Sequence, residues 1–173
     1  FNVGAVGAYM AYIHKEKKIL INGYEKKILV TYHPATNDLL NSKKDLLELL
    51  SAIVSLKKYY FLVTFPGYDL DSSLIIKKIS KLKKFKNIKV INETEKYHFY
   101  DYLKNFDLFI GNSSSGVIES ASAKIPFLNI GNRQSGRLVS NNTFNISGNK
   151  NKIIKYINII LNKKNINYNN IYL

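Results

Sequence analysis

Residues 108–116 read Leu-Phe-Ile-Gly-Asn-Ser-Ser-Ser-Gly, a short apolar run that passes through glycine and serine into a helical pattern. The apolar run 108–110 is typical of a buried strand, Gly111 ends it, and we expect a helix over about 115–123. A strand that leads directly into a helix is half of a strand–helix–strand unit, and such units build parallel sheets. The stretch therefore indicates an α/β protein.

The same alternation of strand and helix patterns extends from residue 27 towards the end of the chain. Apolar, β-branched runs predict further strands at 28–32, 60–65, 88–91, 126–130 and 143–146. Three–four spacing of apolar residues predicts helices at about 42–54 with Ser42 as the N-cap, and at 74–82, 97–105 and 149–161. Near-continuous apolar strands are buried on both faces, and right-handed crossovers then give a doubly wound, Rossmann-like parallel sheet.

The 173 residues suit about one domain of this kind. We expect residues 27–173 to form the ligand-binding Rossmann-like domain and residues 1–26 to be an interdomain or hinge segment, because no clear strand precedes residue 27. The Asn-rich stretch 162–173 is expected to be either a loose or a docked tail.

Composition excludes several classes of site. The chain has no cysteine, which excludes disulfide scaffolds, cysteine nucleophiles and thiolate zinc sites. Its three histidines lack zinc-ligand spacing, so we expect no metal. No stretch reaches the roughly 18 apolar residues of a membrane helix, and no signal peptide opens the chain. We therefore expect a cytoplasmic protein with no membrane partner.

The net charge of +14 raises the question of nucleic acid. Of the 26 basic residues only Arg133 and Arg137 are arginines, although arginine is preferred for bidentate contacts to phosphate and guanine. Lys, Asn and Ile are abundant throughout, which is typical of a codon-composition bias. We interpret the charge as a solvated lysine-rich surface and expect no nucleic-acid partner; nucleic-acid binding stays an alternative that rests on charge alone.

Doubly wound sheets bind ligands beyond the carboxyl ends of their strands. The loops that follow predicted strands are 33–36, 66–69, 111–116 and 131–137. Loop 111–116 combines glycines, which let the backbone approach a ligand, with serine hydroxyls and the free N–H groups of a helix start. This composition suits an anion such as phosphate, although it matches neither the Walker loop nor the dinucleotide fingerprint. The alternative is an ordinary serine-capped helix.

Charged and titratable side chains are expected around that loop. Glu119 lies one helical turn beyond it, where a carboxylate suits ribose hydroxyls, or merely caps the helix or faces solvent. Arg133 and Arg137 follow the strand at 126–130 and suit bidentate recognition of phosphate, or form a surface pair. His33 follows the strand at 28–32 and suits a phosphate contact or proton transfer near neutral pH, unless its role is structural.

Three motifs in register resemble one family. They are Gly111-Asn112-Ser113-Ser114-Ser115-Gly116-Val117-Ile118-Glu119, Asn129-Ile130-Gly131-Asn132-Arg133-Gln134-Ser135-Gly136-Arg137 with Pro126 ahead of it, and Tyr32-His33-Pro34-Ala35-Thr36. Together they resemble the UDP-N-acetylglucosamine 2-epimerase family. The His-Pro-x-Thr form is similar to the hydrolysing branch, which makes N-acetylmannosamine or a related sugar for sialic-acid-type nonulosonates. The resemblance extends over nearly the whole chain.

The resemblance implies the C-terminal domain of a two-domain, glycosyltransferase-B-type fold, with a UDP-sugar in the cleft between the domains. The residues that it assigns to UDP are Asn112, Ser113, Ser114, Gly116, Glu119 and Arg133. Within that set the serines would bind the diphosphate and Glu119 the ribose, while His33 would be catalytic beside the departing UDP and Phe99 would contact the nucleobase. No cofactor is implied.

The resemblance also implies partners. The acid/base carboxylates of the family lie in an N-terminal domain, and nothing here matches them, so we expect this chain to be part of a longer or divided enzyme and to be inactive alone. A homodimer is a further expectation, because the family tends to dimerise. Two functions stay open: the UDP-binding half of a hydrolysing epimerase, or a non-catalytic UDP-sugar-binding half-domain of a glycosyltransferase-B-type protein.

Overall fold

The computed structural model describes residues 4–35, 38–65, 72–92 and 96–173, with no side chains described for 72–74 and 96–98. Thr36 and the predicted loop 66–69 lie outside the described residues. The strands are β1 (Lys27–Thr31), β2 (Tyr60–Thr64), β3 (Ile88–Ile91), β4 (Leu108–Gly111), β5 (Phe127–Ile130) and β6 (Thr143–Ile146). The helices are α1 (Val6–Ile13), α2 (Leu39–Ser55), α3 (Ser72–Ser80), α4 (Lys96–Asn105), α5 (Ser114–Ile118) and α6 (Lys150–Asn162), with a 3₁₀ turn at Lys81–Lys84.

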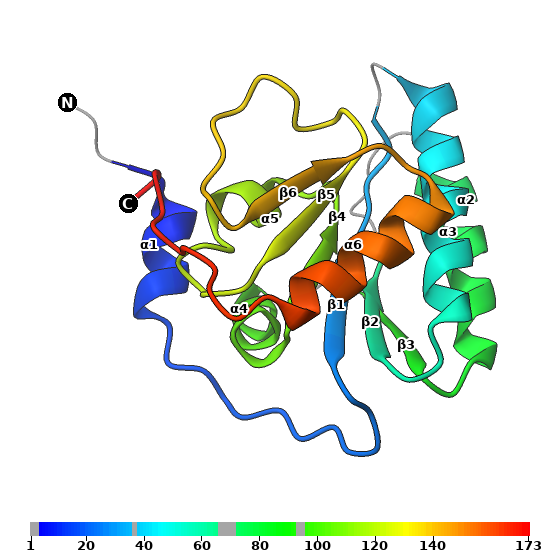
Figure 1. The fold of residues 1–173 in the computed structure, drawn as a ribbon, viewed down its shortest axis with the longest axis horizontal. Coiled ribbons are helices and arrows are strands. Elements are labelled where there is room, and N and C mark those ends of the chain that lie inside the picture. The colour runs from blue at the N-terminus through cyan, green and yellow to red at the C-terminus, as the bar shows by residue number, and fades with distance from the viewer. Residues whose placement is uncertain (1–3, 36–37, 66–71, 93–95) are drawn as a thin grey trace.

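Within the described residues, six strands form one sheet in the order β3-β2-β1-β4-β5-β6, and every neighbouring pair is parallel. Chain order runs outward in both directions from the β1–β4 pair, which is the doubly wound arrangement that the sequence predicts. Figure 1 shows the helices packed on both faces of this twisted sheet. The predicted fold class is confirmed.

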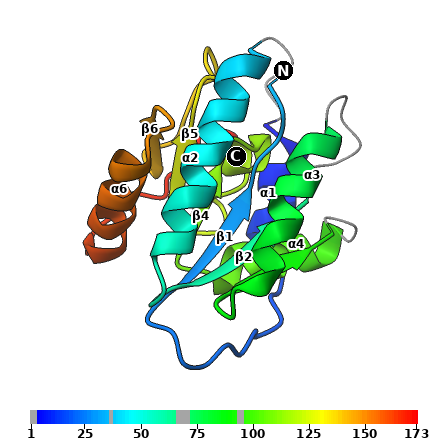
Figure 2. The same ribbon diagram turned by 90° about the vertical axis from the view of Figure 1, so that its right-hand side faces the viewer.

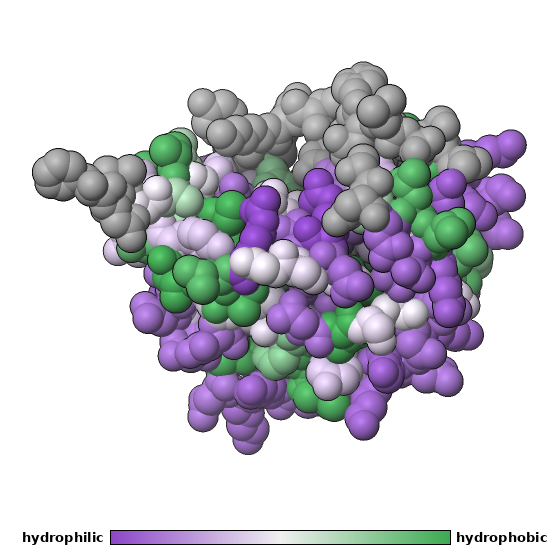
Figure 3. Space-filling view, turned by 90° about the horizontal axis from the view of Figure 1, so that it is seen from above, coloured by the Kyte–Doolittle hydropathy of each residue, from purple (hydrophilic) through white to green (hydrophobic). Residues whose placement is uncertain are grey.

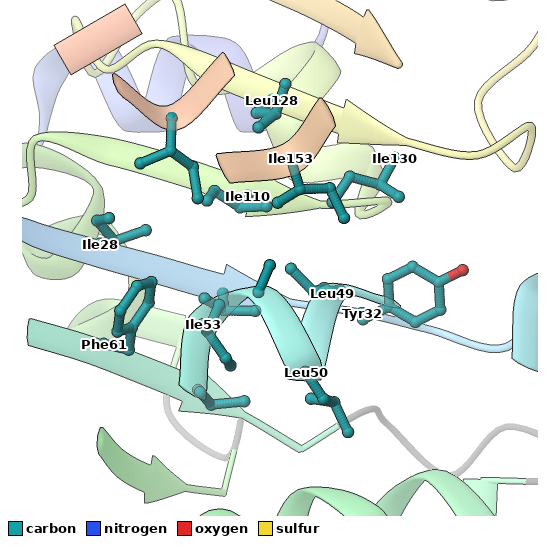
Figure 4. Packing of buried hydrophobic residues seen from close by; sticks show 14 of the residues in the cluster. Ile28, Tyr32, Leu49, Leu50, Ile53, Phe61, Ile110, Leu128, Ile130 and Ile153 are labelled. Carbon is teal, nitrogen blue, oxygen red and sulfur yellow. The ribbon is translucent and has the colours of Figure 1, made fainter. Parts of the chain in front are cut away.

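Alternate residues of each central strand serve opposite faces of the sheet, as the period of two requires. On β1, Ile28 and Val30 join the core under α2, α3 and α6, whereas Leu29 joins the core under α1, α4 and α5. Figure 4 shows the first core, in which Ile53 of α2 and Ile153 of α6 face the strands. Because both faces are covered, the central strands are apolar throughout rather than alternating.

Two predicted helix boundaries are wrong. The helix α2 begins at Leu39 and not after Ser42, and the side chain of Ser42 is buried inside its first turns, where its Oγ accepts a hydrogen bond from the Ala35 N–H at 3.1 Å. The helix α5 ends at Ile118, well short of residue 123. In both places side-chain contacts to other loops override the local pattern.

The first 26 residues contain a helix that the sequence analysis did not predict. α1 buries Ala8 and Ala11 against the sheet side that also carries α4 and α5. The extended segment after it is bound to α4: His14 Nε2 lies 2.8 Å from Asp101 Oδ1, and the side chain of Asn105 accepts from Ile19 N–H at 2.9 Å. Figure 2 shows α1 and α4 on the same side of the sheet, opposite α6. The domain boundary near residue 26 stays a prediction.

Candidate functional site

The carboxyl ends of β1 and β4 lie side by side, since Thr31 and Gly111 are register partners in this sheet. This is the point at which the strand order reverses, and in open α/β sheets it is the usual place for a ligand. Figure 3 looks down on this edge of the sheet, where hydrophilic side chains line the middle of the face. Three of the predicted ligand-binding loops, after β1, β4 and β5, begin here.

Gly111 makes the turn out of β4 possible. Its φ of +142° is a conformation that side chains rarely adopt, and a Cβ on it would overlap the carbonyl oxygen of Thr31. The chain can therefore leave β4 tightly against β1, and this places Asn112 directly beside the loop that follows β1.

Asn112 joins the loops after β1 and β4. Its side chain is buried, with 1% of the residue exposed. Its Oδ1 accepts from the His33 N–H at 2.8 Å, and its Nδ2 donates to the His33 carbonyl at 2.9 Å. One amide group thus satisfies both backbone polar groups of His33, so the position of the histidine follows from that of Asn112.

The backbone of Asn112 brings in the third loop. Its carbonyl accepts one hydrogen bond from Arg133 Nη1 at 3.1 Å and another from Gln134 Nε2 at 2.7 Å. Arg133 is half-buried and Gln134 is buried. From the sequence, Gln134 is only one residue of a motif and has no predicted role, because the residues around a glutamine do not indicate which carbonyl its side chain will bind. The structure therefore brings His33, Asn112 and Arg133 together, as predicted from their places after the strands.

The helix α5 starts inside this group. Ser113 is its N-cap, and its Oγ accepts from the Ser115 N–H at 3.3 Å. Gly116 is buried and lies so close to Phe127 of β5 that a Cβ would collide with the ring. The close packing holds the first turn of α5, with Ser114 half-buried, against β5 at the carboxyl edge of the sheet. The Ser115 N–H is already bonded to Ser113 Oγ and the Gly116 N–H to the Ser113 carbonyl. The hydroxyl groups of Ser113 and Ser114 can donate hydrogen bonds to an anion at this turn.

Glu119 and Phe99 lie on the α4 side of the site. Glu119 is the C-cap residue of α5 and is half-buried. It lies close to Tyr100, and burial together with the Glu119 charge raises the pKa of the Tyr100 phenol to about 12. The ring of Phe99 is half-buried and packs edge-on to Phe109, with 6.0 Å between ring centroids.

The two arginines separate in the structure. Arg133 lies against Asn112 and, with Tyr32, Ser42 and Asp45, lines a cavity of about 10 Å³. Arg137 is exposed and lies on the rim of a different hollow of about 420 Å³ beside β5 and β6. Only Arg133 belongs to the group around Asn112. The geometry therefore does not support phosphate binding by both arginines at one place.

Asp45 of α2 is a residue of this region that the sequence analysis missed. Its carboxylate accepts a hydrogen bond from the Gly148 N–H and touches Gly131, whose φ is +80°. Burial raises the pKa of the Asp45 carboxyl above its usual range. Asp45 thus holds the start of the Arg133 loop against α2. The sequence around Asp45 gives no indication of this contact, because a polar residue at such a position of a helix usually faces solvent.

In the part of the chain that the structure describes, no three His, Cys, Asp or Glu side chains come together as a metal site. None of the described helices is long and apolar enough to cross a membrane.

Comparison with known proteins identifies the family. The family model for UDP-N-acetylglucosamine 2-epimerase matches residues 1–173. The chain belongs to the UDP-N-acetylglucosamine 2-epimerase family. It is 30% identical over 179 aligned residues to a hydrolysing UDP-N,N'-diacetylbacillosamine 2-epimerase from Legionella pneumophila, covering 99% of this chain and 47% of that protein. It is 32% identical to a hydrolysing GDP/UDP-N,N'-diacetylbacillosamine 2-epimerase from Campylobacter jejuni, covering 82% and 39%.

The family is also visible in the fold. The UDP-GlcNAc 2-epimerase of Methanocaldococcus jannaschii, solved with UDP-GlcNAc and UDP, superposes with a TM-score of 0.65 at 22% identity, over 87% of this chain and 42% of that one. At that identity the likeness concerns the fold alone. The chain spans less than half the length of these family members, and what it matches is consistent with their C-terminal domain.

Proposed function

We propose that this chain binds the UDP moiety of a UDP-N-acyl-sugar, as the nucleotide-binding half of a hydrolysing UDP-N-acetylglucosamine 2-epimerase that acts in the cytoplasm. The observation that carries the proposal is the group around Asn112, which joins the loops after β1, β4 and β5 at the reversal point of the sheet. Such a junction is a site for a phosphate-bearing ligand in folds of this kind.

The diphosphate is expected at the first turn of α5. The hydroxyl groups of Ser113 and Ser114 would supply donors, and Gly116 lets the turn lie directly against Phe127 of β5. Arg133 uses Nη1 for the Asn112 carbonyl, which holds its guanidinium beside the same turn. An arginine fixed in this way keeps further N–H donors for the phosphate oxygens.

The remaining predicted contacts extend on both sides of the diphosphate. In the proposed arrangement Glu119 accepts hydrogen bonds from the ribose hydroxyls, and Phe99 contacts the base. The backbone of His33 is bonded to Asn112, and we assign its imidazole to the sugar side of the diphosphate. An imidazole there stabilises or protonates the departing diphosphate near neutral pH.

The proposed reaction takes two steps. A base removes the proton at C2 of the sugar while the C1–O bond breaks and UDP leaves with the bonding electrons, which gives a 2-acetamidoglucal. Water then adds across the double bond to give the 2-epimer, of the N-acetylmannosamine type, for sialic-acid-like surface glycans. In this scheme the present chain stabilises the leaving group, and an N-terminal partner domain supplies the base, so the chain alone is inactive. The names of the two bacterial relatives support a 2-acylamino sugar as the substrate.

Calorimetric titration of UDP into the purified chain tests the nucleotide site. We expect saturable binding to the wild type and an affinity lower by roughly 10-fold to 100-fold in Arg133→Ala, which is the usual range for one hydrogen bond to a charged group. Arg137→Ala is the matched control. Arg137 is exposed and lies four residues after Arg133, so this variant removes an equal charge outside the site. Its UDP affinity should stay within about twofold of wild type. Equal losses in both variants, or no binding to the wild type at millimolar UDP, would count against the proposal.

A second experiment separates the enzyme from a non-catalytic binding domain. In a two-domain protein assembled from this chain and the N-terminal half of the Legionella pneumophila relative, UDP-GlcNAc should be converted to UDP and free sugar. His33→Ala should lower the rate of UDP release more than it lowers UDP affinity. Binding of UDP-GlcNAc without any release would favour the non-catalytic alternative.

A further inference from the structure

The first turn of α1 lies directly against Glu119. Gly7 is the contact: a Cβ added to it would collide with Glu119 Oε1 and lie 3.2 Å from Cδ and 3.3 Å from Cγ of the same side chain. Every residue except glycine would therefore require the carboxylate of Glu119 to move. Glycine is a poor helix former compared with alanine, and at this position the space that a Cβ would need is taken by Glu119.

The helix α1 is bound to other elements at both ends and along its inner face. Ala8 and Ala11, on its inner face, are fully buried. The Ala5 N–H donates to the carbonyl of Tyr172 at 2.8 Å, and His14, which caps the other end, lies 2.8 Å from Asp101. Because both ends of α1 are bound to other elements, a Cβ at position 7 would displace the flexible Glu119 side chain rather than the helix.

Glu119 has a second neighbour in α4. Tyr100 is 2% exposed, and in the described part of the chain its hydroxyl has no hydrogen-bond partner. The phenol lies close enough to Glu119 to be influenced by its charge. The carboxylate thus lies next to both α1 and α4, two elements that are about 90 residues apart in the sequence.

We propose that the first turn of α1 forms one wall of the ribose subsite and that Gly7 is a positioning residue. Because Gly7 has no Cβ, the Glu119 carboxylate can occupy the position in which it accepts hydrogen bonds from the ribose hydroxyls. The proposal rests on the proposed function, because it takes Glu119 as the ribose contact. It adds that the segment ahead of the Rossmann-like domain helps to build the nucleotide site. Nucleotide binding and the position of α1 are then coupled through one carboxylate.

The test is Gly7→Ala, titrated with UDP and with 2′,3′-dideoxy-UDP. We expect the UDP affinity to fall roughly tenfold, the loss of a hydrogen bond to a charged group, and the affinity for the dideoxy analogue to stay unchanged. The thermal midpoint should stay equal or rise, because alanine is the better helix former. Val6→Ala, at a position 77% exposed in the same turn, is the matched control and should change neither affinity.

A double variant identifies the route of the effect. In Glu119→Ala, which should itself lose the preference for UDP over the dideoxy analogue, adding Gly7→Ala should have no further effect on UDP binding, since the displaced carboxylate is gone. If the wild type binds UDP and Gly7→Ala binds it equally well, the proposal is wrong while the nucleotide site stands. Equal losses for both nucleotides, together with a lower thermal midpoint, would show a general structural effect and would also overturn it. No UDP binding to the wild type would instead contradict the nucleotide site itself.

Discussion

Asn112 shows how much a single residue contributes to this site. Its amide satisfies both backbone groups of His33, and its carbonyl accepts from Arg133 and Gln134. All of these bonds are buried or half-buried, where an unsatisfied polar group costs about 1–3 kcal/mol. No other side chain of similar size offers both a donor and an acceptor in this geometry, so the residue is required for the shape of the site even before any ligand contact.

Tyr32 carries a prediction about stability at alkaline pH. Its hydroxyl donates to the Ser42 carbonyl at 3.0 Å and is buried, and burial raises the pKa of Tyr32 to about 12. A group with a raised native pKa stabilises the fold fully below its unfolded pKa, near 10, and this contribution is lost as the pH rises through the native pKa. Between pH 10 and pH 12 the wild type should therefore lose up to about 3 kcal/mol of unfolding free energy from this residue.

Tyr32→Phe removes the titrating group. At pH 7 the variant should be about 1 kcal/mol less stable, because it loses one neutral hydrogen bond. Above pH 10 its stability should fall less steeply than that of the wild type, so that the two curves approach each other. Urea unfolding at pH 7 and from pH 9 to pH 11.5 measures both quantities. Parallel decline of the two proteins above pH 10 would contradict the assignment to Tyr32.

At the scale of elements, two helices differ from their sequence patterns for the same reason. The apolar spacing from residue 46 onward predicts the body of α2 correctly, but its start is set by Ser42, which bonds backward to Ala35 and lies under Tyr32. α5 ends where its residues contact other segments: Asn170 Nδ2 donates to the Ile118 carbonyl, and Asn142 Nδ2 donates to Ser120 Oγ. Element ends respond to tertiary contacts more than element centres do.

The close approach of α5 to β5 carries the next prediction. Gly116→Ala would place a Cβ into the ring of Phe127. Either the ring or the helix must shift, and overpacking of this kind usually costs 1–3 kcal/mol. Because the displaced element carries the proposed diphosphate site, UDP affinity should fall as well. Thermal unfolding and UDP titration measure the two effects. Ser115→Ala, next to it in the same turn and half-buried, is the control and should change stability by less than about 1 kcal/mol.

At the scale of the whole molecule, the two ends of the chain are joined. The stretch 162–173 proves to be docked rather than loose: Asn170 Nδ2 donates to the Ile118 carbonyl and to Ser122 Oγ, both at 2.8 Å. The next residues reach the other end, since the Tyr172 carbonyl accepts from Ala5 and its hydroxyl donates to the Leu138 carbonyl at 2.7 Å. Figure 1 shows the C-terminal tail beside α1. The tail thus ties α1, α5 and the loop after β5 together.

Deletion of residues 165–173 should therefore act at a distance. We expect a loss of about 2–4 kcal/mol of unfolding free energy from the hydrogen bonds that Asn170 and Tyr172 make to the rest of the domain. We also expect faster amide hydrogen exchange in α1, whose first turn loses its partner, while exchange in α2 changes little. Urea unfolding and exchange measured by mass spectrometry test both. Asn165→Ala, at an exposed position in the same stretch, is the control; unchanged exchange in α1 after the deletion would contradict the proposed link.

The sequence by itself determined the class of the fold and the loops that form the site. Apolar runs and three–four spacing are local properties, so the strands, the bodies of the helices and the parallel arrangement were predictable from them. The glycine- and serine-rich stretch after β4 predicted an anion-binding loop for the same reason, since glycine content and helix starts are also local.

Only the tertiary structure decided which side chains meet. The bond from Asn112 to His33 spans 79 positions, the bond from Asn170 to Ile118 spans 52, and the contacts of Asp45 with Gly148 and of Gly7 with Glu119 are longer still. Nothing in the composition around one partner indicates the other, because such a pair forms only once the sheet has set the distance and direction between them. The helix at 6–13 follows the same rule: its buried alanines become an inner face only when α4 and α5 lie beneath it.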